Sequence, residues 1–198
     1  MLHTTRKRFS VVLTLLLLVC VFGTAAADNA PWPVKTFYGV GVGVSYPPNN
    51  QNVKRQAYYG PNPYTYAGAG AFKARSVQNA VALFREGDFA LVDFYYPSMG
   101  KYCVYFQVQD LTTRNIDQET LTAYPAAVTA EIQPMMGPGY DYRPMEELTP
   151  SRNVRQVLLT RGMRINVLFE MNGWVFAEFS CAIGTVRAWL PASMVESI

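Results

Sequence analysis

The sequence predicts an all-β protein, and three observations support this fold class. Hydrophobic and polar residues alternate along residues 163–170, which is the period of a half-buried strand. The pair Asn172-Gly173 follows directly, and both residues tolerate the positive φ angles of a tight hairpin turn. The third observation is that strand-like segments and turn motifs of the first half of the chain recur in the second half.

The region after this turn predicts two more strands. Residues 174–179 return as the second strand of the hairpin, and a loop that contains Cys181 and Gly184 leads to a third strand at residues 186–190. Pro191 ends that strand because proline has no N–H group to donate to a neighbouring strand.

The N-terminus has the three parts of a secretion signal. Basic residues at positions 6–8 precede an apolar run at 10–22, and alanines at 25–27 form a small-residue cleavage site. A retained membrane anchor is the alternative, but the run is short for the roughly 20 apolar residues of a spanning helix. We therefore expect residues 1–27 to be cleaved and the mature chain to be secreted or extracytoplasmic, in the periplasm or at the cell surface, and not bound to a membrane.

The net charge changes when the signal peptide is removed. The whole chain has 17 basic and 14 acidic residues, and three of the basic ones lie in the signal. The mature chain is therefore formally neutral, with 14 of each. This balance gives no support to nucleic acid or an anionic membrane as a partner.

Two cysteines, Cys103 and Cys181, remain after the signal is removed. An even number of cysteines in an exported protein favours a disulfide between them. The alternative is two buried thiols that pack as small apolar side chains.

The repetition predicts how the chain is organised. Residues 53–66 resemble 128–142, each with a Gly-Pro pair followed by two tyrosines, and residues 76–94 resemble 153–169. Residues 76–86 also have helical spacing, but their counterpart is β-branched, so we predict a short strand or an irregular lead-in and not a helix. The predicted organisation is a signal peptide (1–27), an extended leader rich in proline and glycine (28–52), a first repeat (53–113), a connector (114–127) and a second repeat (128–198). The leader is expected to add at most one edge strand, at residues 36–44.

Residues 162–175, G-x-x-x-x-V-L-x-E-x-N-G-W-V, and residues 187–195, R-A-W-L-P-A-S-M-V, resemble the bacterial SH3-like domains of secreted and cell-envelope proteins. The resemblance implies two small tandem β-barrels. It covers about the last third of the chain, and the first repeat departs from it because residues 95–101 replace the N-G-W hairpin. The resemblance also implies a targeting role, since such modules accompany cell-wall peptidases.

Histidine is missing from the mature chain, because the only one, His3, lies in the signal peptide. Triads that depend on histidine and the usual histidine zinc sites are therefore excluded. We expect no enzyme activity, no cofactor and no metal. A carboxylate-based hydrolase using Glu146, Glu147 or Glu178 is a weak alternative, because adjacent strand residues point to opposite faces and surface carboxylates are common.

Aromatic residues near the Gly-Pro loops are the candidate binding residues. In an SH3-like fold these loops border a groove, and aromatic side chains suit peptides or glycan faces. The candidates are Tyr140, Tyr142, Trp174 and Trp189 in the second repeat and Tyr64 and Tyr66 in the first. The alternative is that the tryptophans only pack the barrel and the tyrosines only stabilise the loops.

The sequence therefore predicts a secreted, non-enzymatic binding module for a cell-wall peptide or glycan, or for an extracellular protein. A structural or assembly protein, whose barrels act as spacers or pack on a partner chain, is the alternative.

Overall fold

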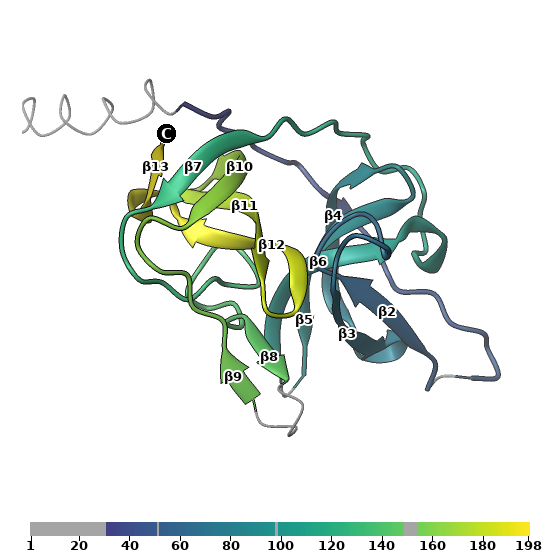
Figure 1. Ribbon diagram of the computed structural model, residues 1–198. Helices are drawn as coiled ribbons and strands as arrows, with labels where there is room; N and C mark the ends of the chain where they lie inside the picture. The colour runs from purple at the N-terminus through teal and green to yellow at the C-terminus, as the bar shows by residue number, and fades with distance from the viewer. Residues whose placement is uncertain (1–30, 51, 98, 149–153) are drawn as a thin grey trace, which may run out of the picture.

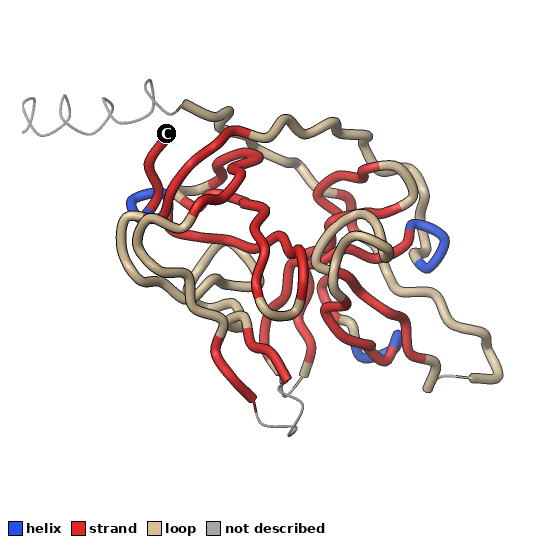
Figure 2. Tube along the Cα trace, in the orientation of Figure 1, coloured by secondary structure: helices blue, strands red, loops and turns tan. Residues whose placement is uncertain are grey.

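The computed structural model describes residues 31–50, 52–97, 99–148 and 154–198, and the side chains of Glu147 and Leu148 are outside this description. The predicted signal peptide lies outside the described residues. Those residues form strands and three single 3-10 turns, with no α-helix among them, so the all-β prediction is confirmed. Figures 1 and 2 show two groups of strands side by side, with β1 to β6 in one and β7 and β10 to β13 in the other.

The first group is a six-stranded antiparallel sheet with the order β1-β4-β5-β6-β2-β3. Its strands are β1 (Val40–Gly41), β2 (Lys54–Tyr58), β3 (Gly68–Lys73), β4 (Gln78–Glu86), β5 (Phe89–Tyr96) and β6 (Gly100–Gln107). The segment with ambiguous spacing is thus strand β4, which confirms the strand alternative over an irregular lead-in. The leader contributes β1 at the sheet edge, which confirms its predicted edge strand.

The second group is a five-stranded antiparallel sheet with the order β12-β11-β10-β7-β13. Its strands are β7 (Tyr124–Val128), β10 (Arg164–Met171), β11 (Trp174–Cys181), β12 (Gly184–Pro191) and β13 (Val195–Ser197). A separate hairpin joins β8 (Glu146–Leu148) to β9 (Val154–Gln156). The 3-10 turns are Ala74–Ser76, Val108–Asp110 and Ala192–Met194.

The hairpin predicted from Asn172-Gly173 is present. Both residues have positive φ angles, 54° and 77°, and they join β10 to β11 as a two-residue turn. This matches the right-handed twist of the flanking strands, which is why Asn-Gly is favoured there. The three predicted strands of this region correspond to β10, β11 and β12.

The predicted closed barrels are not formed: the structure has two antiparallel sheets, neither of which closes on itself. The reason lies in β12, the edge strand of the second sheet. Arg187 of β12 donates its N–H to the carbonyl of Tyr59, and Ala67 donates to the carbonyl of Thr185 in the same strand. Part of this edge is thus occupied by the first half of the chain and not by a strand of its own sheet.

Four strands of each sheet follow the same order, β1-β4-β5-β6 in the first sheet and β7-β10-β11-β12 in the second, whereas β2, β3 and β13 have no counterpart in this order. In the first half Asp93 of β5 pairs with Cys103 of β6, and in the second half Glu178 of β11 pairs with Arg187 of β12. The strand preceding each three-stranded meander also corresponds, since β1 pairs with β4 and β7 pairs with β10. β7 lies mostly in the segment assigned from sequence to the connector, and the boundaries of the repeats stay a prediction.

The buried side chains form two clusters, and each cluster contains residues from both halves of the chain. Phe84 of β4 packs against Phe169 of β10 with ring centroids 5.9 Å apart, and Phe37 of the leader contacts both rings at 4.7 and 5.2 Å. Trp32, also in the leader, is buried and donates its indole N–H to Glu170. Separating the halves would expose these aromatic side chains to water. The free-energy cost would be large, because aromatic side chains bury the most apolar area per residue.

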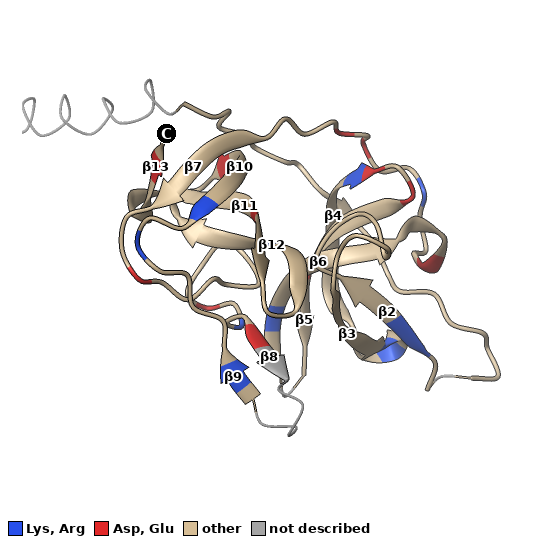
Figure 3. Ribbon diagram, viewed as in Figure 1, with Lys and Arg blue, Asp and Glu red and all other residues tan. Residues whose placement is uncertain are grey.

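The positions of basic and acidic residues are interspersed along the ribbon of both halves (Figure 3). Within the described ranges, no helix has the length and apolar character needed to cross a membrane.

Candidate ligand groove

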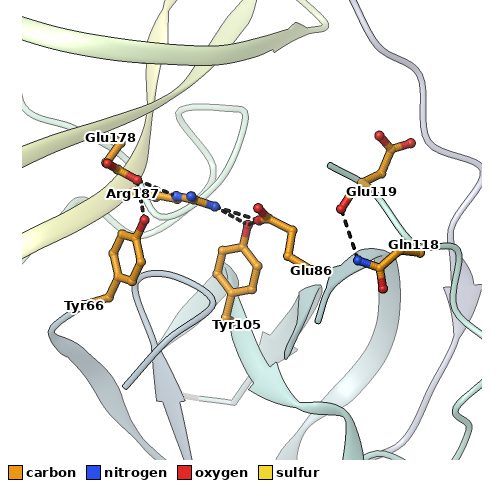
Figure 4. Close-up of polar contacts among 7 residues, drawn as sticks. All are labelled: Tyr66, Glu86, Tyr105, Gln118, Glu119, Glu178 and Arg187. Carbon is orange, nitrogen blue, oxygen red and sulfur yellow. Dashed lines mark hydrogen bonds and ion pairs between the residues drawn. The ribbon is translucent and has the colours of Figure 1, made fainter. Parts of the chain in front are cut away.

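A buried arginine holds the two halves together at their interface. Arg187 of β12 has a side chain only 9% exposed and lies between two carboxylates (Figure 4). Its guanidinium donates to Glu178 at 2.9 Å and to Glu86 of β4 at 2.6 Å. Burial alone would lower the pKa of Arg187, but the surrounding phenol and carboxylate groups, Tyr105 and Glu86 foremost, raise it above its ordinary value. The group is therefore a permanent charge that links β12 to the first sheet.

The two Gly-Pro loops are exchanged between the halves. The loop at 60–66 reaches β12, where Tyr66 forms a bridge with Thr185, and the loop at 137–142 reaches β6, where Tyr142 forms the corresponding bridge with Lys101. Both bridges are parallel, and each loop ends in a tyrosine whose hydroxyl bonds a carboxylate on the opposite half. The acceptor is Glu178 for Tyr66, and it is Asp93, at 2.6 Å, for Tyr142.

These loop tyrosines are structural hydrogen-bond donors. Burial, followed by the hydrogen bond to Glu178, raises the pKa of Tyr66 to about 12, and burial likewise raises the pKa of Tyr142. Both phenols therefore stay protonated at neutral pH. Tyr66 and Tyr142 were predicted to bind a ligand, but here their hydroxyls are already engaged in joining the halves.

A groove of about 460 Å³ lies beside this junction. One wall comes from the first half and contains β3 and the start of β6, and the other comes from the loop before β8, from β9 and from the β11–β12 turn. Its lining residues are Tyr59, Gly68, Ala69, Gly70, Met99, Tyr102, Met136, Arg143, Pro144, Glu146, Val154 and Ile183. The volume falls in the range of small-ligand and peptide sites.

Two tyrosines form the deep part of the groove. Tyr59 and Tyr102 are 6% and 3% exposed, and the hydroxyl of Tyr102 is buried without a hydrogen-bond partner. A buried hydroxyl without a partner costs about 1–3 kcal/mol, so natural proteins rarely leave one. A ligand that accepts a hydrogen bond there would remove this cost.

Both phenols are poor acids. Burial raises the pKa of Tyr59, and the neighbouring Tyr102 raises it further, while burial also raises the pKa of Tyr102. Both hydroxyls therefore remain protonated and can donate to a ligand at neutral pH.

An ion pair forms the polar rim. Arg143 donates to Glu146 at 2.6 Å, and both side chains are about one-third exposed. A charged ligand can therefore replace one partner of this ion pair, because the displaced side chain remains in contact with water and leaves no buried charge unpaired. Apolar contacts on the rim come from Met99 and Val154, which are both exposed.

The structure separates the other predicted binding residues. Tyr140 is 77% exposed and packs edge-on against Trp174, with ring centroids 4.8 Å apart, but Trp174 itself is only 9% exposed. Neither residue lines the groove, and Tyr140 presents a single exposed ring outside it. Trp189 is fully buried against Phe169 and Phe176, and it therefore presents no surface to a ligand. It is a core residue because its strand faces the shared interior.

Tyr64 lines a second hollow, of about 710 Å³, but is itself 97% exposed. It stands at the tip of the loop at 60–66, where its backbone N–H donates a hydrogen bond to the side-chain oxygen of Asn62. The walls of this hollow are largely loop and strand-end residues, with the buried Phe89 and Val108 among them, whereas the smaller groove is bounded by the buried rings of Tyr59 and Tyr102. The smaller groove is the better candidate.

The predicted disulfide is not formed, and Cys103 and Cys181 are not joined. Cys103 is fully enclosed on β6, where it pairs with Asp93, and burial raises the pKa of its thiol. Cys181 lies at the end of β11, where it pairs with Gly184. The residue of the second half that corresponds to Cys103 is Arg187, so the cysteines do not occupy equivalent or facing positions.

The carboxylates considered for hydrolysis do not form a facing pair. Glu146 is bound to Arg143, and Glu178 is bound to Arg187 and to Tyr66. The side chain of Glu147 lies outside the described part of the structure. Within that part, no cluster of three or more metal-ligating side chains occurs.

Of the residues that line the groove, only Glu146 was named as a candidate from the sequence, and it was named for hydrolysis and not for binding. Tyr59 and Tyr102 were not among the candidates, because the groove arises only where the loops cross between the halves. The Gly-Pro repetition was the available signal, since Tyr59 immediately precedes the first Gly-Pro pair and Met136, also in the groove, immediately precedes the second.

Comparison with known proteins leaves the family open. No protein-family model and no curated protein matches the chain. Among solved structures the chain is similar to NlpC1 from Trichomonas vaginalis, with 12% identity and a TM-score of 0.26 over 86% of this chain and 50% of that one. The chain thus spans half the length of that structure, and at this TM-score the function has to be argued from the groove itself.

Proposed function

We propose that this chain is an exported, non-enzymatic binding protein whose groove recognises a cell-envelope or extracellular ligand. The observation that carries the proposal is the unpartnered hydroxyl of Tyr102 in a groove walled by buried aromatic side chains. Export rests on the N-terminal signal pattern, and the two halves are proposed to be divergent SH3-like units on the resemblance of residues 162–175 and 187–195.

The groove suits recognition because its parts are fixed before any ligand arrives. Tyr102 packs against the rings of Phe72 and Phe94. The backbone of Arg143 is held by a hydrogen bond from its N–H group to the carbonyl of Lys101. Preorganised donors bind tightly because little entropy is lost on association. The polar groups of the groove donate and accept hydrogen bonds, which matches a peptide or a glycan.

Retention on purified cell-wall sacculi tests this proposal. The chain from Asp28 onward, which keeps every described residue, is compared with Met99→Glu, which places a charge on the exposed rim of the groove. Tyr38→Glu is the matched control, because Tyr38 is exposed and is not a lining residue of the groove. Thermal melts confirm that both variants fold.

The proposal expects sacculi to retain the parent chain and Tyr38→Glu, and to retain Met99→Glu at least about tenfold less, because the new carboxylate is unpaired at the site of contact. If the parent chain is not retained by sacculi or by other envelope fractions, the structural alternative is favoured, in which the halves act as a spacer or pack on a partner chain.

A further inference from the structure

Strand β3 is an open sheet edge beside the groove. It is the last strand of the six-stranded sheet, and among the described residues no strand pairs with its outer side. Its sequence, GAGAFK, has small side chains at the first four positions, and these are exposed or half-buried. Natural sheets usually protect such an edge with charge, proline or a covering loop.

Hydrogen-bond alternation shows which backbone groups face outward. Ala74 donates its N–H to Val53 across the β2–β3 pair, and the antiparallel alternation makes Phe72 the next residue to face β2. Ala71 and Lys73 therefore direct their N–H and C=O groups away from β2. The hydrogen bond from the N–H of Lys73 to the Tyr96 hydroxyl, at 3.3 Å, agrees with this direction.

The edge and the groove are continuous. Gly68, Ala69 and Gly70 line the groove, and Ala69 has no partner in β2 because the register shifts at that point. An extended segment lying along Ala71 would continue directly over the hollow that contains Tyr102. Small side chains along the edge let another backbone approach to hydrogen-bonding distance.

We propose that β3 is the docking edge for an extended peptide, which adds to the sheet as a further strand and places a hydrogen-bond acceptor over the hydroxyl of Tyr102. This rests on the proposed function and names its ligand class. Strand addition satisfies the outward groups of Ala71 and the buried Tyr102 hydroxyl together, whereas a glycan has no regular row of amides to meet the edge. The Arg143–Glu146 pair lies across the groove, where it meets charged side chains of the peptide.

A peptide array supplies the probe. Acetylated and amidated hexapeptides of varied sequence are incubated with the chain from Asp28 onward, and the strongest binder is resynthesised with one N-methyl group at each position in turn. Strand addition requires that N-methylation weakens binding about tenfold at alternate positions and by less than about twofold between them, because alternate N–H groups face the sheet.

Two variants locate the peptide. Ala71→Pro removes one outward N–H group, which an edge strand tolerates, and binding of the same hexapeptide falls about tenfold, whereas the control Ala71→Ser retains it. Tyr102→Phe removes only the hydroxyl and weakens binding about five- to tenfold. The N-methyl series needs no variant, so it decides the question even if Ala71→Pro folds poorly.

The proposal is overturned if no hexapeptide binds with a Kd below about 1 mM, or if N-methylation has no period of two. In that event, sacculus retention that still depends on Met99 leaves the proposed function intact and assigns the groove to another ligand. Loss of sacculus retention with peptide binding preserved would instead overturn the envelope ligand and keep strand addition.

Discussion

Replacing Arg187 should destabilise the whole chain, because this side chain links the two sheets. Arg187→Met keeps much of the apolar stem but leaves Glu86 and Glu178 side by side without their cation. Removing one partner of a buried ion pair costs about 3–5 kcal/mol, and since the carboxylates are 16% and 25% exposed, about 3 kcal/mol is the appropriate value. For a chain of this size that lowers the Tm by roughly 6–12 °C.

Urea unfolding followed by tryptophan fluorescence measures this loss. Arg164→Met is the control, because Arg164 is exposed on β10, and its free energy of unfolding should change by less than about 0.5 kcal/mol. Adding Glu86→Gln and Glu178→Gln to Arg187→Met should recover part of the loss, since no unpaired carboxylate remains. A loss below about 1 kcal/mol for Arg187→Met would refute the inference that this arginine joins the halves.

Three further predictions concern single side chains. Burial raises the pKa of Asp93, so the folded chain binds that proton more tightly than the unfolded chain, and the Asp93 contribution to stability falls as the pH rises from about 4. Asp93→Asn should therefore gain relative stability between pH 4 and 7 in urea titrations, and a relative loss would contradict the sign. Gly173→Ala should cost about 1 kcal/mol because φ is +77° with open space around it, whereas Gly41→Ala should be nearly neutral; equal Tm changes would count against the turn argument. Gly137→Ala should cost about 1–3 kcal/mol, because the added Cβ would overlap the Tyr142 ring, and an unchanged Tm would show that this packing is looser than described.

Local features were predictable from the sequence, and this holds best for β10 to β12. The alternation at 163–170, the Asn172-Gly173 turn and the proline after the last strand depend only on residues near each other in the chain. The corresponding segment at 76–86 was ambiguous on its own, and comparison with its β-branched counterpart correctly excluded a helix but left a short strand and an irregular lead-in as alternatives.

Features that depend on long-range packing were not predictable. Closed barrels were expected from the resemblance to bacterial SH3-like domains, but the exchange of the two loops is set by contacts such as Tyr142 with Asp93, 49 residues apart. Whether Trp189 is buried or exposed was left open for the same reason. The alternation of the strand assigns Trp189 to one face of the sheet, but it does not show that both halves cover that face. The groove followed from this exchange and could not be located from one repeat alone.

Amide NMR spectra during a titration with solubilised cell-wall fragments show whether the ligand lies in the groove between β3 and the β8–β9 hairpin. We expect the amide resonances of residues 68–71, 99–102, 143, 145 and 146 to shift together and to saturate with one affinity. Shifts confined to Tyr140 and Trp174, or no shifts with any envelope fragment, would contradict this expectation.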